Sequence, residues 1–459
     1  MLKKEKKDRG YKTSQLILAS FAFGSIMVLW TIYNSYVPLI LDQKLNHLGS
    51  ITLGSATIAT LIGFIMAIDN FFGLIFQPIF GKKSDDTRSR FGKRMPYVIT
   101  GIIACSALFV LIPLMARIDG IAGIGAMMAV IICFNFVMST WRAPCVAIMP
   151  DMVPAEYQSG GNAVVNMTSA VFTVIASASA GILGLFGFGN KIDGGEYSSV
   201  FIFGACLALL SLVVLLTCVK WKDNREEKFE CENKAQEKKR ESIRSLGLTE
   251  DEKRSMIIMM IALFCISGTS DGVGTYFTLY ATKLLGMSAT TATMIKTVGT
   301  LGAVLVAVPA GVLGRKIGRR KTILTGLSIV IGMHILMYAL PYTAGSHIVV
   351  WMYLCYFIYA GAFIMININT LPIMLSIGGE ERYGAFTGYY YFATFTAAVI
   401  CPVVIGFIVG KTNYNMIHIF ALCLIIVAFF CMQKVRHGEH LSEQEEKAIE
   451  AVVQAAENA

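Results

Sequence analysis

Charged residues are scarce in this 459-residue chain. Only 15% of its residues are Asp, Glu, Lys or Arg, whereas a typical soluble globular domain has about 25%. Hydrophobic residues make up 55% of the chain and the mean hydropathy is +0.63. The low charge and the high hydropathy exclude both a water-soluble globular protein and an intrinsically disordered one.

The sequence also lacks the short motifs of common enzyme classes. It has no HExxH, no GxSxG and no Walker GxxxxGK[ST] pattern, so we predict neither an enzyme nor a cofactor or metal site. None of the 11 cysteines stands in a CxxC pair, and ten of them lie in apolar stretches. We interpret them as small hydrophobic residues rather than disulfide partners or metal ligands.

Long apolar runs fill most of the chain. A bilayer core of about 30 Å needs about 20 apolar residues in a helix, and the first run is too long for a signal peptide. We therefore predict an all-α polytopic membrane protein with twelve spans, at residues 14–41, 54–81, 96–116, 123–149, 161–187, 199–219, 255–283, 288–313, 322–341, 347–375, 385–410 and 414–433.

The basic residues are distributed unevenly about these spans. Of the 39 Lys and Arg, two fall inside spans, five fall on one side (Lys44, Arg117, Lys191, Lys283, Lys411), and the other 32 fall on the opposite side. Because cytoplasmic loops carry the excess of basic residues, we predict that both termini are cytoplasmic and that the membrane is the plasma membrane. The net charge of +9 is then a topology signal, and we expect no nucleic-acid partner.

A polar stretch divides the spans into six plus six. We predict a cytoplasmic tail at 1–13, a six-helix bundle at 14–219, a linker at 220–254, a second six-helix bundle at 255–433 and a tail at 434–459. The tail has a capping-box pattern at Ser442 and Glu445, which predicts a short surface helix. The loops at 81–94 and 311–321 both begin with Gly and end in Gly followed by two or three basic residues. Two matched halves are typical of transporters.

At this point the sequence resembles a known family. The loop "GVLGRKIGRRK" (311–321) is similar to the cytoplasmic signature of the major facilitator superfamily. The blocks "GLIFQPIFGKKSDDTRSRFGKRMPY" (73–97) and "APCVAIMPDMVP" (143–154) resemble its glycoside–pentoside–hexuronide:cation symporters, in particular the sucrose transporters and their proton–sugar relatives.

Two departures qualify what this resemblance implies. The Arg that sucrose transporters carry at the position of Val146 is matched here one helical turn earlier, by Arg142. The two carboxylates of the sodium-coupled relatives fall on Gly73 and Gln77. The resemblance therefore implies a proton rather than sodium as the coupling ion.

Four charged residues lie inside predicted spans: Asp69, Arg142, Asp271 and Lys296. Each costs about 2.5–3.5 kcal/mol to insert, so pairing, water or neutralisation must offset the cost. Two pairs are the simplest hypothesis, Asp69 with Arg142 and Asp271 with Lys296. A carboxyl group balanced between burial and a nearby cation can take up and release a proton. We name Asp69 and Asp271 as proton-coupling candidates; structural ion pairs are the alternative.

A sugar needs hydrogen-bonding partners and a flat apolar face. Polar and aromatic residues of the spans that could contact it are Trp30, Tyr33, Asn34, Gln77, Asn135, Arg142, Lys296, Tyr356, Tyr359, Asn367 and Tyr390. Helix packing and interface belts are the alternative role of the aromatic residues. For His334 and His418 we favour a hydrogen-bonded core role over titration.

Charged residues of the basic loops and their neighbours could form a cytoplasmic gate. The candidates are Asp85, Arg88, Arg90, Arg94, Asp151, Arg315 and Arg319. The alternative is that they only set topology; both roles are compatible.

The function we predict is sugar or glycoside:proton symport by alternating access. The partners are then a small solute, a proton and the lipid bilayer, with the protein a monomer. An exporter of organic ions or drugs has the same architecture and is the nearest alternative. A membrane sensor and an integral membrane enzyme are more distant ones.

Overall fold

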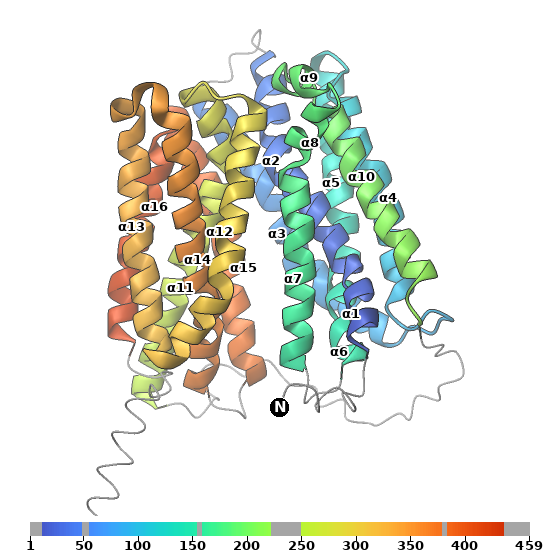
Figure 1. Cartoon of the computed structure of the whole chain (residues 1–459), viewed down its shortest axis with the longest axis vertical. Helices are drawn as coiled ribbons and strands as arrows, with labels where there is room; N and C mark the ends of the chain where they lie inside the picture. The colour runs from blue at the N-terminus through green and yellow to red at the C-terminus, as the bar shows by residue number, and fades with distance from the viewer. Residues whose placement is uncertain (1–11, 48–54, 154–157, 222–248, 379–382, 436–459) are drawn as a thin grey trace, which may run out of the picture. The chain divides into compact units, whose positions relative to one another are not determined.

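The computed structural model describes residues 12–47, 55–153, 158–221, 249–378 and 383–435, and these fold into helices joined by short loops (Figure 1). The predicted tail helix at Ser442, and residues 222–248 of the predicted linker, lie outside the described residues. Within those ranges no β-strand occurs.

The described residues of the first half form ten α-helices: α1 (Thr13–Ala19), α2 (Phe21–His47), α3 (Ser55–Asp85), α4 (Met95–Met115), α5 (Gly120–Val146), α6 (Ile148–Met152), α7 (Gln158–Ser177), α8 (Ser179–Leu185), α9 (Gly189–Asp193) and α10 (Ser198–Thr217). The second half contains α11 (Glu250–Leu279), the π-helix η4 (Tyr280–Leu284), α12 (Ala289–Lys316), α13 (Arg319–Thr343), the 3₁₀ turn η5 (Gly345–His347), α14 (Ile348–Gly378), α15 (Tyr383–Lys411) and α16 (Met416–Lys434).

Eleven of the described helical stretches are long and apolar enough to cross a membrane, and the bent pair α7–α8 makes a twelfth if it is one span. Each coincides with a predicted span, which confirms the all-helical polytopic fold. Large apolar side chains such as Phe64, Leu305 and Phe430 are exposed, as expected where lipid surrounds a helix.

Three predicted spans are interrupted. The first breaks after Ala19, where the Ser20 hydroxyl donates to the carbonyl of Leu16 at 2.6 Å; such bonds to the preceding turn bend helices. The fourth breaks at Ala147, three residues after Pro144, whose nitrogen cannot donate. The fifth bends by 53° between α7 and α8.

The helix boundary at Thr249 shows how capping decides where a helix begins. The Thr249 hydroxyl accepts from the backbone N–H of Glu252, and the Glu252 carboxylate accepts from the N–H of Thr249. This capping box starts α11 at Glu250, five residues before the predicted span, because the pair satisfies donors that the first turn leaves unpaired.

The chain forms two compact units. Unit 1 comprises Met1–Glu230 and Ala281–Thr297; unit 2 comprises Cys231–Tyr280 and Val298–Ala459. The segment Ala281–Thr297 thus lies in the second half of the sequence but belongs to unit 1. The division into bundles at 14–219 and 255–433 remains a prediction.

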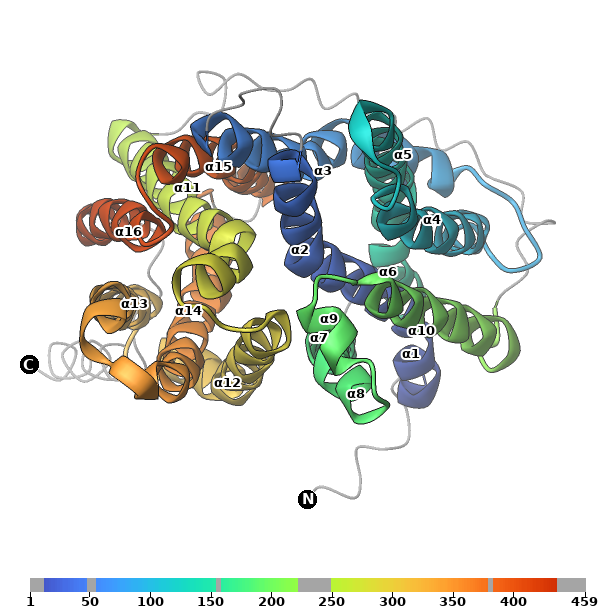
Figure 2. The same ribbon diagram turned by 90° about the horizontal axis from the view of Figure 1, so that it is seen from above.

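In unit 1, α5 packs against α3 and α4, and α2 against α7 and α10 (Figure 2). Phe109 sits at the centre, with ring centroids 4.5 Å from Phe201 and 5.5 Å from Phe134. The ring of Trp141 fills the space where a side chain at Gly101 would stand. These aromatic contacts fix α5, which carries Asn135 and Arg142.

In unit 2, α11 packs against α15 and α16, and α13 against α14 and α16. Gly268 of α11 lets Cys401 of α15 approach, since a Cβ at this position would stand 2.4 Å from the Cys401 sulfur. The ten described cysteines are all free; Cys133, Cys206, Cys218 and Cys423 are exposed.

Candidate functional site

Arg142 and Trp30 form the best-defined contact among the predicted site residues. The guanidinium of Arg142, on α5, lies over the indole ring of Trp30, on α2, 4.0 Å from the ring centroid. A cation over an indole face is favourable, and more so away from water. The contact fixes the direction of the Arg142 side chain in unit 1.

Tyr33 and Asn135 meet beside this contact. The amide of Asn135 donates to the Tyr33 hydroxyl at 3.0 Å, and both residues are about 1% exposed. The Tyr33 ring also stacks on Phe134 at 5.4 Å. This hydrogen bond joins α2 to α5 one helical turn along α2 from Trp30.

Asp69 completes the group. It lies on α3, is 6% exposed, and interacts electrostatically with Arg142 and with Tyr33. Five predicted residues are therefore gathered in unit 1, and we call Trp30, Tyr33, Asp69, Asn135 and Arg142 the unit 1 cluster. The cluster combines an aromatic face, a hydrogen-bonded amide and phenol, a cation and a carboxylate.

Two further candidates of unit 1 are partly exposed. The Gln77 amide nitrogen folds back onto Gly73, where a Cβ would stand 2.7 Å from it. Asn34 follows Tyr33 on α2. Their contact with a solute stays a prediction.

Unit 2 places Asp271 close to an aromatic row. Asp271, on α11, interacts electrostatically with Tyr359 of α14 and with Cys401 of α15. The ring centroids of Tyr356 and Tyr359 lie 5.4 Å apart, and those of Phe277 and Tyr356 lie 4.4 Å apart in a tilted arrangement. Asp271, Tyr356 and Tyr359 are thus brought together within one unit.

Lys296 belongs to unit 1, whereas Asp271 belongs to unit 2. The Lys296 ammonium donates to the hydroxyl of Ser35, on α2, at 3.2 Å. The proposed pairing of Lys296 with Asp271 stays a prediction.

Two candidates of unit 2 lie further from Asp271 along the chain. Asn367 is exposed on α14. The Tyr390 hydroxyl of α15 lies 3.5 Å from that of Thr370, which is at the edge of hydrogen-bond distance. Their part in a solute site stays a prediction.

His334 and His418 are hydrogen-bonded core residues, as predicted. Their Nδ1 atoms lie 3.2 Å apart and both side chains are fully buried. Tyr280 packs edge-on against His418 at 4.7 Å, and Tyr359 against His334 at 5.2 Å. The pair ties α13 to α16. Among the described residues no group of three or more His, Cys, Asp or Glu is placed to hold a metal ion.

Arg94 is the centre of the predicted gate residues. It pairs with Asp85 at 2.5 Å and with Asp151 at 2.8 Å, and it donates to the Ser84 hydroxyl at 2.5 Å. Burial opposes its charge, but the bonds to Asp151 and Asp85 outweigh that effect and raise the pKa of Arg94. Arg94 thereby ties α3, α4 and α6 together inside unit 1.

The other gate candidates lie in the loop after α3 and at the junction of α12 and α13. Arg88 is exposed, and the exposed Arg90 lies over the Phe91 ring at 4.5 Å. Arg319 is the first residue of α13, and Arg315 lies near the end of α12. A gate role for the whole set remains a prediction.

Several ion pairs of unit 1 are not indicated by the sequence, and the most buried carboxylate among them belongs to Asp42. The Lys283 ammonium lies 2.7 Å from the Asp42 carboxylate, and Asp42 is 4% exposed. The sequence identifies Lys283 only as one of the few basic residues on the sparsely charged side of the membrane. An acidic residue directly after a long apolar run could have drawn attention to Asp42.

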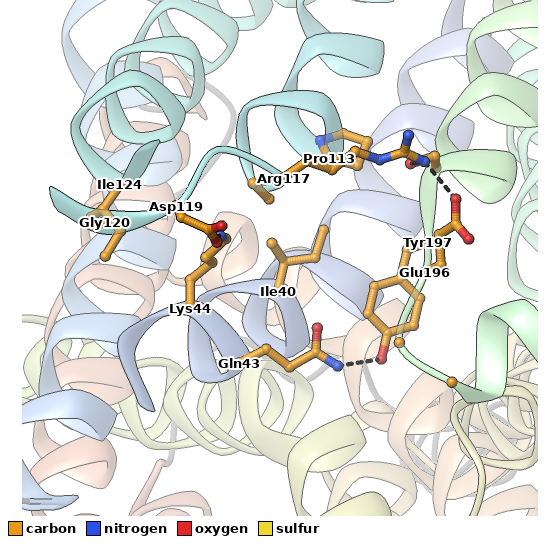
Figure 3. Close-up of a pocket in the computed structure, with 14 residues that line it drawn as sticks. Ile40, Gln43, Lys44, Pro113, Arg117, Asp119, Gly120, Ile124, Glu196 and Tyr197 are labelled. Carbon is orange, nitrogen blue, oxygen red and sulfur yellow. Dashed lines mark hydrogen bonds and ion pairs between the residues drawn. The ribbon is translucent and has the colours of Figure 1, made fainter. Parts of the chain in front are cut away.

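A polar pocket of about 750 Å³ opens at the same end of unit 1, which we call the Asp42 end (Figure 3). Lys44 lies 3.6 Å from Asp119, and Arg117 pairs with Glu196 at 2.5 Å. Burial raises the pKa of Tyr197, whose hydroxyl faces the Gln43 amide, to about 12. None of the predicted site residues lines this pocket.

Comparison with solved structures supports the fold. The nucleoside transporter NupG matches with a TM-score of 0.62 at 16% identity, over 92% of this chain and 99% of that one. A bacterial homologue of the iron transporter ferroportin, in an inward-facing state, matches with a TM-score of 0.65 at 16% identity, over 92% and 98%. The peptide transporter POT matches with a TM-score of 0.64 at 13% identity, over 92% and 95%.

Sequence comparison adds the family. A search of curated protein sequences found no match. The profile of the Major Facilitator Superfamily matches residues 19–396 and 259–456. Since these matches span most of the chain and the fold agrees, the protein belongs to the Major Facilitator Superfamily and is a multi-pass membrane transporter of small solutes.

Proposed function

We propose that the protein is a sugar or glycoside:proton symporter that works by alternating access. The observation that carries the proposal is the unit 1 cluster. Arg142 covers the indole face of Trp30 at 4.0 Å, and Tyr33 and Asn135 are hydrogen-bonded at 3.0 Å beside it. Guanidinium, amide and phenol groups are donors and acceptors suited to the hydroxyls of a sugar.

The proton is assigned to Asp69 and Asp271. Each is a carboxyl group inside a membrane helix, where charge is costly. The cationic Arg142 interacts with Asp69, whereas Asp271 lies near the neutral phenol of Tyr359. Coupling requires that proton and solute each bind more tightly when the other is bound.

The resemblance to sucrose transporters supports the sugar, because blocks 73–97 and 143–154 carry it. Arg94 and Asp151, which the structure joins at 2.8 Å, come from these two blocks. We assign the protein to this branch, in the plasma membrane as a monomer with cytoplasmic termini.

Uptake into proteoliposomes tests the proposal. We expect labelled sucrose to accumulate under an inward proton gradient and to stop accumulating when a protonophore collapses that gradient. The matched alternative substrates are a nucleoside, a dipeptide and a lipophilic cation, because similar folds transport the first two solute classes. Efflux of the cation without entry of any disaccharide would reject sugar symport in favour of an exporter.

A further inference from the structure

The polar pocket at the Asp42 end has the size of a small-molecule site. Its volume of about 750 Å³ falls within the range of about 300–1,000 Å³ that ligand pockets occupy. Three segments of unit 1 line it: the end of α2, the turn between α4 and α5, and the turn between α9 and α10. Gln43, in its wall, follows Tyr33 by ten residues on α2, or roughly 15 Å at 1.5 Å per residue. The pocket is therefore separate from the unit 1 cluster.

Two glycines shape the wall of the pocket. Gly120 has a φ of +74° and Gly195 a φ of +92°, values that residues with a Cβ rarely adopt. A Cβ at Gly195 would also stand 2.5 Å from the amide nitrogen of Gln43. Glycine at position 195 thus lets the turn between α9 and α10 approach α2, and the two residues that follow it, Glu196 and Tyr197, line the pocket.

The charged groups of the pocket are already paired with one another. The Lys44 ammonium lies 3.6 Å from the Asp119 carboxylate, and the Arg117 guanidinium lies 2.5 Å from that of Glu196. Figure 3 shows these two pairs on either side of Ile40. The charges of the described lining residues therefore sum to zero. A charged solute would have to displace one member of a pair, whereas an uncharged solute can enter with both pairs intact.

Between the two pairs the pocket offers an amide and a phenol. The Gln43 amide nitrogen lies 3.5 Å from the Tyr197 hydroxyl, at the edge of hydrogen-bond distance, so a hydroxyl of a ligand can replace this bond at little cost. Amide and phenol groups both donate and accept, and a paired carboxylate keeps free acceptor positions. The apolar side chains of Ile40 and Pro113 lie among them. Hydroxyl groups on a carbon ring match such a mixed lining.

We propose that this pocket is a binding site for an uncharged sugar, separate from the unit 1 cluster. The ligand class follows from the lining groups, which are rich in donors and acceptors and carry no net charge. On the predicted topology the Asp42 end faces away from the cytoplasm, so the pocket holds the solute before the solute reaches the unit 1 cluster. That order of events rests on the proposed function, whereas the ligand class rests on the pocket alone.

Protection of an introduced cysteine measures binding without transport. In an Ala116→Cys variant in detergent the new thiol lines the pocket, and peptide mass mapping distinguishes its maleimide adduct from those of the native cysteines. Saturating sucrose or maltose should slow this labelling about threefold to tenfold. Ile121→Cys is the matched control, because Ile121 is 66% exposed and does not line the pocket. Equal slowing at the two positions would overturn the site, as would no slowing at position 116.

Variants of the lining test which groups hold the sugar. Gln43→Ala or Tyr197→Phe, added to Ala116→Cys, should raise the half-protecting sucrose concentration about threefold to tenfold, because each removes a hydrogen-bonding group. Lys191→Gln, at an exposed position of α9 outside the lining, is the control and should leave that concentration unchanged. Arg142→Lys should also leave it unchanged. Protection that is lost in Arg142→Lys but kept in both lining variants would place the sugar in the unit 1 cluster and overturn the pocket site.

Charged sugars test the ligand class. Glucuronate and glucosamine, at the same ionic strength as the neutral sugars, should need at least about tenfold higher concentrations to protect Ala116→Cys. Protection by either one at the concentration of sucrose that protects would overturn the proposal of an uncharged ligand. If proteoliposomes accumulate no sucrose, the proposed function fails, but the protection measurements still decide the pocket site.

Discussion

The guanidinium of Arg142 lies 4.0 Å from the centroid of the Trp30 ring and interacts electrostatically with Asp69. Arg142 therefore joins an aromatic residue of α2 to a carboxyl group of α3 from its own position on α5. Movement of this one side chain would change the surroundings of both Trp30 and Asp69, and under the proposed function Arg142 would therefore link the solute to the proton.

Arg142→Lys should weaken transport although it keeps the charge. Lysine lacks the planar fork and stacks less well on indole, and losing a contact of about 0.5–2 kcal/mol corresponds to a roughly 2- to 30-fold rise in the solute concentration needed for half-maximal uptake. Initial rates of sucrose uptake at several concentrations measure it. Arg254→Lys, at an exposed position of α11, is the control and should behave like the parent; equal kinetics for the two variants would contradict the role of Arg142.

The variants Asp69→Asn and Asp271→Asn test whether these residues couple solute transport to the proton gradient without being needed for movement of the solute itself. Because an amide cannot carry the proton, each variant should lose accumulation driven by the proton gradient and keep exchange of labelled for unlabelled sucrose. Asp251→Asn is the control, since Asp251 is exposed in the first turn of α11. Gradient-driven accumulation at the parental level in both variants rejects the assignment of Asp69 and Asp271.

Arg94→Lys should destabilise the protein. One ammonium cannot reproduce the bonds that Arg94 makes to Asp85, Asp151 and Ser84, and leaving partly buried partners unsatisfied costs about 1–3 kcal/mol. Thermal unfolding in detergent should shift to lower temperature. Lys82→Gln, at an exposed position in the last turn of α3, is expected to unfold close to the parental temperature.

Two glycines of unit 1 make a matched pair. A Cβ at Gly101 would stand 2.2 Å from the Trp141 ring, whereas one at Gly125 would meet nothing within 4 Å. Gly101→Ala should therefore cost about 1–3 kcal/mol through overpacking, and Gly125→Ala should leave stability unchanged or raise it by about 0.5–1 kcal/mol, since alanine favours helix. Thermal unfolding of the two variants side by side distinguishes them. Equal destabilisation would argue against the packing of α4 on α5 through Trp141.

The spans were predictable because a helix needs about 20 apolar residues to cross a bilayer. Those residues are consecutive in the sequence, so each span can be recognised without knowledge of the fold. The interruptions at Ser20 and Ala147 were not, because apolar runs such as 14–41 continue through them. Helix α11 begins at Glu250, five residues before the predicted span, because of the Thr249 capping box. The capping pattern is present in the sequence, but hydropathy alone set the predicted boundary.

The candidate site likewise has residues that the sequence identifies and contacts that only the structure shows. The cost of a charge in the membrane singled out Asp69, Arg142, Asp271 and Lys296 from composition and position alone. Which partners those charges meet depends on helices far apart in the chain. Arg142 rests on Trp30, 112 positions earlier, and Lys296 donates to Ser35, 261 positions earlier.

Membrane class, number of spans and the four intramembrane charges thus follow from the order of residues, since hydropathy and charge act over one helix at a time. The Asp42–Lys283 pair, the Arg94 network and the membership of Ala281–Thr297 in unit 1 needed the folded chain. Polar side chains on a helix can pair with any neighbour that packing supplies, and nothing in the local pattern says which helix that neighbour will be.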